Sequence, residues 1–322
     1  GDLNQIVAIS LKPPFQLRPV LDLQQQVQGI DIGPDGSLYV DQVSRPVEVL
    51  RFSDSGRNME HIGGFPNITM DLLNPAVHLP DGRTLGTGMI GGRRRLLVTA
   101  PGKEAVPFIQ TDEETSWPTV LLGNDRLAFV IGSGEERRLA IAAVENGRIL
   151  GSIPGIKAST ILGVSSPDGE TLYFGDAFKI WSVPVAGGTP REITEGTGVA
   201  AFPDGKHLVV TTWGPDSVTF KKVSAETGEA QPLVPKDPVR FSPMSWLGAR
   251  PIARDGRMLV LLLGRDAWFW KPGIWDTRDG TVREIPLDYP GDMFLPSWTD
   301  DGRIVVAAYA YQSSVWRYKP AK

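Results

Sequence analysis

The sequence contains no cysteine and only three histidines among its 322 residues. The absence of cysteine excludes disulfide bonds, thiolate metal sites and a cysteine nucleophile, but it does not identify the cellular compartment. The three histidines, His61, His78 and His207, occupy different positions in the repeat described below. Metal sites need several ligands that converge, so we expect no metal cluster here and predict no cofactor.

The sequence also lacks long apolar runs and any excess of one charge. No apolar run reaches the roughly 18 residues of a membrane-spanning helix, and no amphipathic stretch of helical period reaches about ten. The formal net charge is −4, and the only basic run, Arg93–Arg95, is short. We therefore expect no nucleic-acid partner and no direct membrane insertion by this segment.

Glycine and proline are abundant instead. The chain has 36 Gly and 27 Pro, about a fifth of all residues, against a usual share of about 12%. Eleven of them fall in seven tight-turn signals, most of which contain Asp-Gly. The turns are marked by Asp35, Asp81, Asn124, Asp168, Asp204, Asp255 and Asp301. Successive markers are 36 to 51 residues apart, a period typical of repeat architectures.

Each unit reads as four short strands. Asp-Gly between apolar runs predicts a hairpin, because Gly adopts the positive φ of the turn and Asp tolerates it. The runs after the turns, such as Thr171–Phe174 and His207–Thr211, are rich in β-branched and aromatic residues. A third run such as Ile180–Val185 follows, and often a weaker fourth such as Arg191–Thr194. A unit of this size is one propeller blade.

The two ends of the chain predict how the ring closes. The 34 residues before Asp35 and the 21 after Asp301 together amount to about one repeat. The last unit has three strands, and Phe15–Leu23 is then available as its missing outer strand, which would remove an open sheet edge. We therefore predict an all-β, seven-bladed β-propeller of four-stranded antiparallel blades. Residues 1–322 would form a single domain, with 1–28 as closing strand and lead-in and 29–322 as the blades.

Several units resemble a known repeat family. Val164–Phe174, Ala200–Val210 and Trp298–Val306 are similar to the repeat of TolB-like, WD40-like β-propellers, and Ile180–Pro190 has the stretch that ends this repeat. The first unit, Gly29–Val40, is also similar to NHL and gluconolactonase-type propellers. The resemblance covers about residues 29 to 318, and it is specific for fold and poor for function.

The resemblance implies a context. Such bacterial domains follow a serine/threonine kinase or a winged-helix regulator domain, usually across a membrane segment, or stand alone as periplasmic scaffolds. It therefore implies a periplasmic or other extracytoplasmic location, and a cytoplasmic one stays open. The chain begins at Gly1 without a methionine, and we expect further domains before it.

No catalytic motif is evident. There is no G-x-S-x-G, no Walker sequence and no calcium-loop spacing. The repeated Asp residues are explained by turn chemistry, because every unit has one. What remains is the loop-rich rim of the channel, where turns between second and third strands gather. The predicted binding residues there are Asp41, Arg45, Arg93, Trp117, Asp176, Trp213, Asp216, Arg265, Asp266 and Tyr311.

The sequence is compatible with two main functions, and a third interpretation is a structural module of a larger receptor that binds no ligand. The first is a non-catalytic interaction or sensory domain, a monomer that binds a protein or peptide on the loop-rich face, because a complete repeat with Arg and aromatic loops lacks catalytic residues. The second is a metal-assisted sugar lyase or lactonase that uses His78 with a carboxylate such as Asp176 or Asp216. Three or more His, Asp or Glu side chains converging on one point would favour the enzyme.

Overall fold

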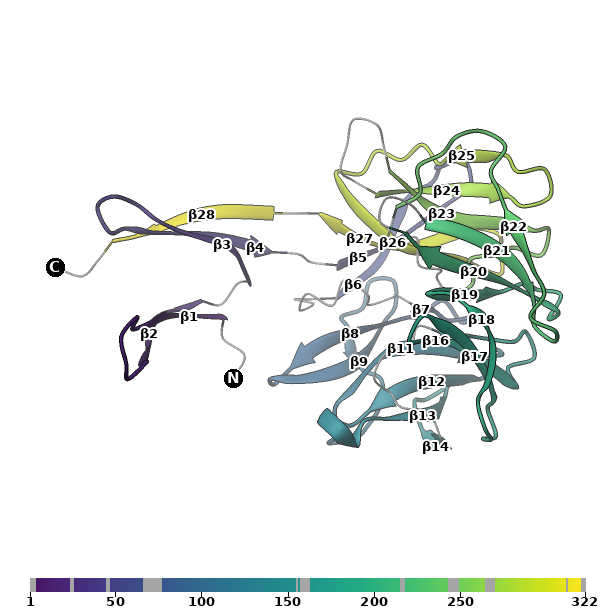
Figure 1. Ribbon diagram of the computed structural model, residues 1–322, viewed down its shortest axis with the longest axis horizontal. Helices are drawn as coiled ribbons and strands as arrows, with labels where there is room; N and C mark the ends of the chain where they lie inside the picture. The colour runs from purple at the N-terminus through teal and green to yellow at the C-terminus, as the bar shows by residue number, and fades with distance from the viewer. Residues whose placement is uncertain are drawn as a thin grey trace.

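A computed structural model describes residues 4–23, 26–44, 47–65, 77–154, 156, 163–214, 218–242, 249–263, 270–310 and 312–319. The described chain is built of antiparallel β-strands, with one short 3₁₀ helix, η1 (Gly134–Glu136). Figure 1 shows a large ring of sheets and, at one side, a smaller group of strands that contains both termini. Within these residues no helix is long and apolar enough to cross a bilayer.

The ring consists of six sheets in the described residues, which we number as blades 1 to 6. Blade 1 is β26 (Gly291–Trp298), β27 (Ile304–Ala310), β5 (Val47–Phe52) and β6 (Glu60–Phe65). Blade 2 is β7 (Val77–His78), β8 (Thr84–Ile90), β9 (Arg93–Thr99) and β10 (Val106–Pro107); blade 3 is β11 (Thr115–Leu122), β12 (Arg126–Ile131), β13 (Arg138–Ala143) and β14 (Ile149–Ile153). Blade 4 is β15 (Gly163–Ser165), β16 (Thr171–Asp176), β17 (Lys179–Pro184) and β18 (Arg191–Glu195); blade 5 is β19 (Gly198–Ala201), β20 (His207–Trp213), β21 (Val218–Ser224) and β22 (Ala230–Leu233). Blade 6 is β23 (Arg257–Leu263), β24 (Trp270–Asp276) and β25 (Val282–Glu284), with bridges from Phe241 and Ile252 on the inner side of β23.

The hydrophobic core lies between the blades. Six clusters of buried side chains occur in the described residues, and each joins two neighbouring sheets. In the cluster that closes the ring, Leu259 and Ile274 of blade 6 pack against Phe52 and Ile304 of blade 1. Strands that are covered on both faces must be apolar on both faces, which explains their nearly continuous hydrophobic runs.

The closing strands differ from the prediction. β27 pairs with β5, with Ile304 opposite Phe52 and Tyr309 opposite Val47, so strands from both ends of the chain share blade 1. The segment predicted for this role, Phe15–Leu23, pairs instead with β1 (Asn4–Ile9) as β2 (Leu17–Leu23). The predicted count of seven blades is wrong for the described chain, and residues 29–44 are not part of the ring.

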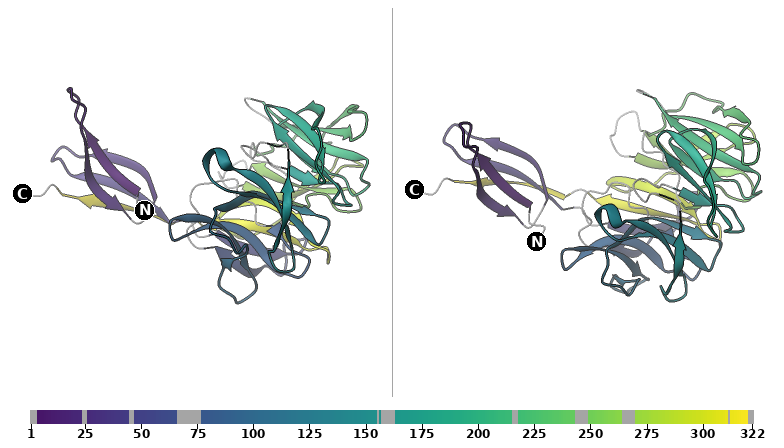
Figure 2. Two further views of the ribbon diagram at one scale, coloured as in Figure 1. Left: turned by 90° about the horizontal axis from the view of Figure 1, so that it is seen from below. Right: turned by 60° about the horizontal axis from the view of Figure 1, so that its bottom comes forward.

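Residues 29–44 belong to a stalk, which we define as β1, β2 and the loop that joins them, together with β3 (Gln26–Ile32), β4 (Leu38–Ser44) and β28 (Gln312–Tyr318). β4 lies between β3 and β28. The pairing of β28 with β4 continues the register of β27 with β5, since Tyr309 faces Val47 and Gln312 faces Ser44, three residues further on each strand. The two strands thus leave blade 1 as one ribbon, and Figures 1 and 2 show it running away from the ring.

The difference between the seven predicted blades and the six in the described residues has a physical reason. The Asp35 turn is a genuine hairpin turn between β3 and β4, with Gly36 at φ +76°, but a turn does not determine which sheet its hairpin joins. The pattern of burial separates the two cases. All eight residues of the inner strand β26 are buried, whereas Ile30 and Ile32 of β3 are 52% and 70% exposed. Inner blade strands need two covered faces, and β3 does not have them.

Candidate functional site

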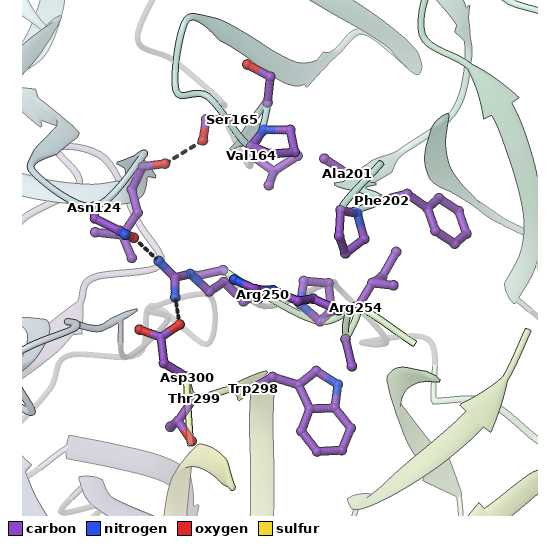
Figure 3. Close-up of a pocket in the computed structure, with 18 of the residues that line it drawn as sticks. Asn124, Val164, Ser165, Ala201, Phe202, Arg250, Arg254, Trp298, Thr299 and Asp300 are labelled. Carbon is purple, nitrogen blue, oxygen red and sulfur yellow. Dashed lines mark hydrogen bonds and ion pairs between the residues drawn. The ribbon is translucent and has the colours of Figure 1, made fainter. Parts of the chain in front are cut away.

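The turns between the first and second strands of the blades gather on one face of the ring, which we call the turn face. A cavity of about 690 Å³ opens there at the centre of the ring, shown in Figure 3. Blades 1, 3, 4, 5 and 6 all contribute to it. Its lining includes Asn124, Val164, Ser165, Pro167, Phe202, Pro203, Arg250, Pro251, Ile252, Arg254, Arg257, Trp298 and Asp300.

Hydrogen bonds within the Asp-Gly turns position the residues that line the cavity. In blade 4 the carboxylate of Asp168 accepts hydrogen bonds from the backbone N–H of Glu170 at 3.0 Å and from the hydroxyl of Ser166. In blade 1 hydrogen bonds from Thr299 and Arg303 hold the pKa of Asp301 at about 2. Each of these two carboxylates is satisfied within its own turn, as the turn interpretation predicts. The prolines and the residues beside the turns are left to form the wall of the cavity.

Arg250 spans the cavity floor. Its guanidinium donates to the Asn124 side-chain oxygen of blade 3 at 2.7 Å and to the Asp300 carboxylate of blade 1 at 2.8 Å. Its backbone carbonyl accepts the N–H of Trp298 at 2.9 Å. Arg250 therefore ties three parts of the ring together, and its charge is already balanced by Asp300.

Two donors in the cavity wall have no acceptor among the described residues. Trp298 is 7% exposed, and its indole Nε1 is buried without a hydrogen-bond partner there. This nitrogen is shielded from solvent and therefore from the open cavity. Arg254 is exposed and forms no ion pair or hydrogen bond with another residue of the described ranges. By contrast, the guanidinium carbon of Arg257 lies over Trp298, 5.0 Å from the ring centroid, and Arg257 pairs with Asp54 and Asp255, each at 2.8 Å.

A second hollow of about 290 Å³ adjoins the first on the same face. It is lined by His78, Arg51, Asp81, Asp300 and Asp301, among others. The His78 ring nitrogen Nδ1 lies 3.3 Å from the Thr84 hydroxyl. This half-buried imidazole is the histidine on which the predicted enzyme would depend.

The structure does not bring the predicted enzymatic residues together. His78 lies beside the turn of blade 2, whereas Asp176 ends β16 at the opposite face of the ring, where it is paired with Lys179. Asp216 lies outside the described residues. Across the described part of the chain, no group of three or more His, Asp or Glu side chains is placed to hold one metal ion.

The pKa of His78 provides a test of its environment. Burial, and then the positive charge of Arg51, lower this pKa below the usual value of about 6.5. The unfolded chain then binds more protons than the folded chain just below pH 6.5, so stability should fall as the pH drops from there through the folded pKa. His78→Gln should remove this fall, while His61→Gln, at an exposed position near the start of β6, should not. Urea unfolding at several pH values between about 7.5 and 5 measures both.

The opposite face of the ring, which we call the rim face, carries the turns between second and third strands. Arg93 begins β9 there and donates to the Asp112 carbonyl at 2.8 Å, Asp176 ends β16, and the 42% exposed Trp213 ends β20. The backbone of Trp117 lies near the same end of β11. Asp41 does not belong to this group, because β4 places it in the stalk. The other predicted binding residues, Arg45, Asp216, Arg265, Asp266 and Tyr311, lie outside the described residues.

Sequence reasoning missed the turn-face residues Arg250, Arg254 and Trp298. A signal for them exists, because Arg254 directly precedes the Asp255-Gly256 turn and Trp298 lies two residues before the Asp300-Asp301-Gly302 turn of the last repeat. The turn carboxylates are explained by hydrogen bonds within their own turns. The side chains beside them that have no partner are therefore the groups that this face can present to a ligand.

No protein-family model and no curated protein matches the chain. Solved structures are similar in fold. One, described as "putative TolB" from Agrobacterium tumefaciens, is 15% identical with a TM-score of 0.58, and the match covers 83% of this chain and 99% of that one. Another, oligogalacturonate lyase in complex with manganese, is 12% identical with a TM-score of 0.50, covering 89% and 98%. Identities this low establish a TolB-like β-propeller fold and no activity.

Proposed function

We propose that this chain is a non-catalytic interaction domain that binds a protein or peptide segment, as part of a larger bacterial signalling or envelope protein outside the cytoplasm. The observation that carries the proposal is the turn-face cavity, with its apolar wall and the unpaired guanidinium of Arg254. Its volume of about 690 Å³ suits a short stretch of peptide, since ligand pockets are commonly about 300–1,000 Å³.

The charges of the cavity favour an acidic ligand. Among the lining residues are three arginines and one carboxylate, Asp300. Arg250 and Arg257 already have carboxylate partners, which leaves Arg254 to receive an incoming anion. Phe202 and the prolines offer apolar contact.

The test is panning of an acidic peptide display library on the purified chain, followed by fluorescence anisotropy with a selected peptide. We expect Arg254→Glu to weaken binding by about tenfold or more, because it replaces an attractive contact with a repulsive one. Arg254 is exposed and unpaired in the described chain, so its replacement should leave the unfolding midpoint unchanged. Arg148→Glu, at an exposed arginine in the turn before β14, is the matched control and should have little effect.

The rim face is the other candidate surface, and the same assay distinguishes the two. Charge reversal at Arg93 and Arg265 together should weaken partner binding if the rim residues hold the partner. A peptide that is lost from this double variant and kept by Arg254→Glu would contradict the turn-face site. A library that yields no binder would contradict the interaction function itself.

The alternative is a metal-assisted sugar lyase or lactonase. What favours it is the likeness of fold to a manganese-containing oligogalacturonate lyase, and that likeness concerns the fold alone. Incubation of the chain with oligogalacturonate and Mn²⁺, followed by ultraviolet absorbance for an unsaturated product, tests it. Product formation that is lost in His78→Gln would support the enzyme and contradict a non-catalytic role.

A further inference from the structure

Exposed apolar side chains are concentrated on the stalk. Of the eighteen large hydrophobic residues exposed in the described chain, ten lie in the stalk. They are Val7, Ile9, Leu11, Phe15, Leu17, Val20, Ile30, Ile32, Val315 and Trp316. Scattered exposed hydrophobic residues are ordinary on a protein surface, but a contiguous group marks a surface that contacts something else.

Six of the ten belong to the β1–β2 hairpin. Ile9 is paired with Leu17 and Val7 with Pro19, so these side chains share one face of the hairpin. Opposite residues of an antiparallel pair lie on the same side of the sheet. The strip ends at the pair of Gln5 and Asp22, whose side chains are hydrogen-bonded at 2.7 Å. One face of the hairpin is therefore apolar from this polar pair to its tip.

The tip extends the apolar strip. Leu11 is 90% exposed and Phe15 is 67% exposed. Ser10 closes the loop, since its single hydroxyl hydrogen is shared between the carbonyls of Lys12 at 3.0 Å and Pro14 at 3.1 Å, and its oxygen accepts the N–H of Gln16 at 3.0 Å. The loop is thus a compact projection that presents a Leu and a Phe to the surroundings.

All charge at the tip is positive. Between Val7 and Val20 the charged residues are Lys12 and Arg18, and there is no Asp or Glu. Apolar side chains with interspersed basic residues match the interface of a bilayer that contains anionic lipids, because the apolar groups enter the acyl boundary while the cations stay at the headgroups. A partner protein with an apolar pocket would not require this charge pattern.

We infer that the tip of the β1–β2 hairpin docks on the surface of an anionic lipid bilayer. The strands have six and seven residues, short of the roughly 9–11 that a bilayer-spanning strand needs, so the hairpin would lie in the interface and not cross it. The inference goes beyond the proposed function and departs from the expectation drawn from composition. Composition averages over the whole chain and does not register six exposed apolar residues in one hairpin.

The placement of the stalk is compatible with a ligand on the ring. β27 begins beside the Asp301 turn on the turn face and runs to Ala310, from which the ribbon to the stalk departs. The stalk therefore extends from the rim face. A bilayer at the hairpin tip would lie on the other side of the ring from the turn-face cavity, which Figures 1 and 2 allow the reader to follow.

The absence of native cysteine makes a direct test simple. The full chain with Leu11→Cys is labelled with a polarity-sensitive fluorophore and mixed with vesicles of phosphatidylcholine alone or with a quarter of phosphatidylglycerol. We expect a blue shift with the anionic vesicles and little with the neutral ones. Val234→Cys, a 70% exposed site on the ring, is the matched control and should not shift. Flotation of the unlabelled chain measures binding independently.

Two double variants separate the apolar and charged contributions. Lys12→Glu with Arg18→Glu should weaken flotation with anionic vesicles by more than about tenfold, at roughly fivefold per basic residue removed. Leu11→Ser with Phe15→Ser should also abolish flotation, whereas Val234→Ser with Phe178→Ser should not. Equal binding to neutral vesicles, no blue shift at position 11, or flotation that survives the tip variants would overturn the inference. A shift that appears without vesicles and grows with protein concentration would overturn it in favour of a second copy.

Discussion

Replacement of Phe52 by alanine should lower the free energy of unfolding by about 3–5 kcal/mol, the usual cost of removing a buried phenylalanine side chain. Phe52 is fully buried in β5, opposite Ile304, in the cluster that joins blade 6 to blade 1. Its loss would create a cavity at the point where the ring closes. Phe15→Ala is the matched comparison: this phenylalanine is 67% exposed, and its replacement should change stability by less than about 0.5 kcal/mol.

Urea unfolding of the two variants beside the parent chain measures the difference. Deletion of residues 1–25 extends the test, because that segment includes the strand predicted from the sequence to close the ring. Since the segment lies in the stalk, its deletion should leave the unfolding midpoint of the ring nearly unchanged. A large loss of stability on this deletion or in Phe15→Ala, with little change in Phe52→Ala, would place the closing strand where the sequence suggested.

The second large effect is expected at a turn glycine. Gly169 has φ +74°, and a Cβ there would lie 2.5 Å from the backbone N of Gly123 and 2.6 Å from the carbonyl carbon of Leu122 in the neighbouring blade. Gly205 has φ +68°, but the nearest atom to its Cβ would be Pro167 Cδ at 3.7 Å. Gly205→Val should therefore cost about 1–3 kcal/mol from backbone strain alone. Gly169→Val should cost more than about 4 kcal/mol, because the backbone of blade 3 must also move.

Thermal and urea unfolding of both variants test this ranking. Asp168→Asn serves as a control for the turn, since an amide oxygen can accept the same backbone N–H and the change should be mild. Equal losses at Gly169 and Gly205 would mean that the contact between blades 3 and 4 relaxes at little cost. A loss of ligand binding in Asp168→Asn with folding intact would contradict the assignment of this carboxylate to turn chemistry.

Only part of the candidate site could be predicted from the sequence. The loops of the rim face could be grouped because second-to-third-strand turns share one end of every blade, and Arg93, Asp176 and Trp213 do lie at that end. Asp41 could not be excluded from the group, because the repeat pattern assigns its strand to a blade. The cavity depends on Arg250, which reaches Asn124 across 126 positions of the chain, and no local pattern encodes such a contact.

The sequence by itself determined the strands, the hairpin turns and hence the all-β propeller class, because these depend on neighbours a few residues apart. Asp-Gly turns and apolar runs specify a hairpin wherever they occur, and the glycines of all seven turns, from Gly36 to Gly302, have positive φ. Only the tertiary structure decided how many hairpins enter the ring and which strands close it. That choice depends on whether both faces of a strand find a neighbouring sheet. Both faces of β26 find a neighbouring sheet. The faces of β3 do not, because β3 leaves the ring with the ribbon of β4 and β28.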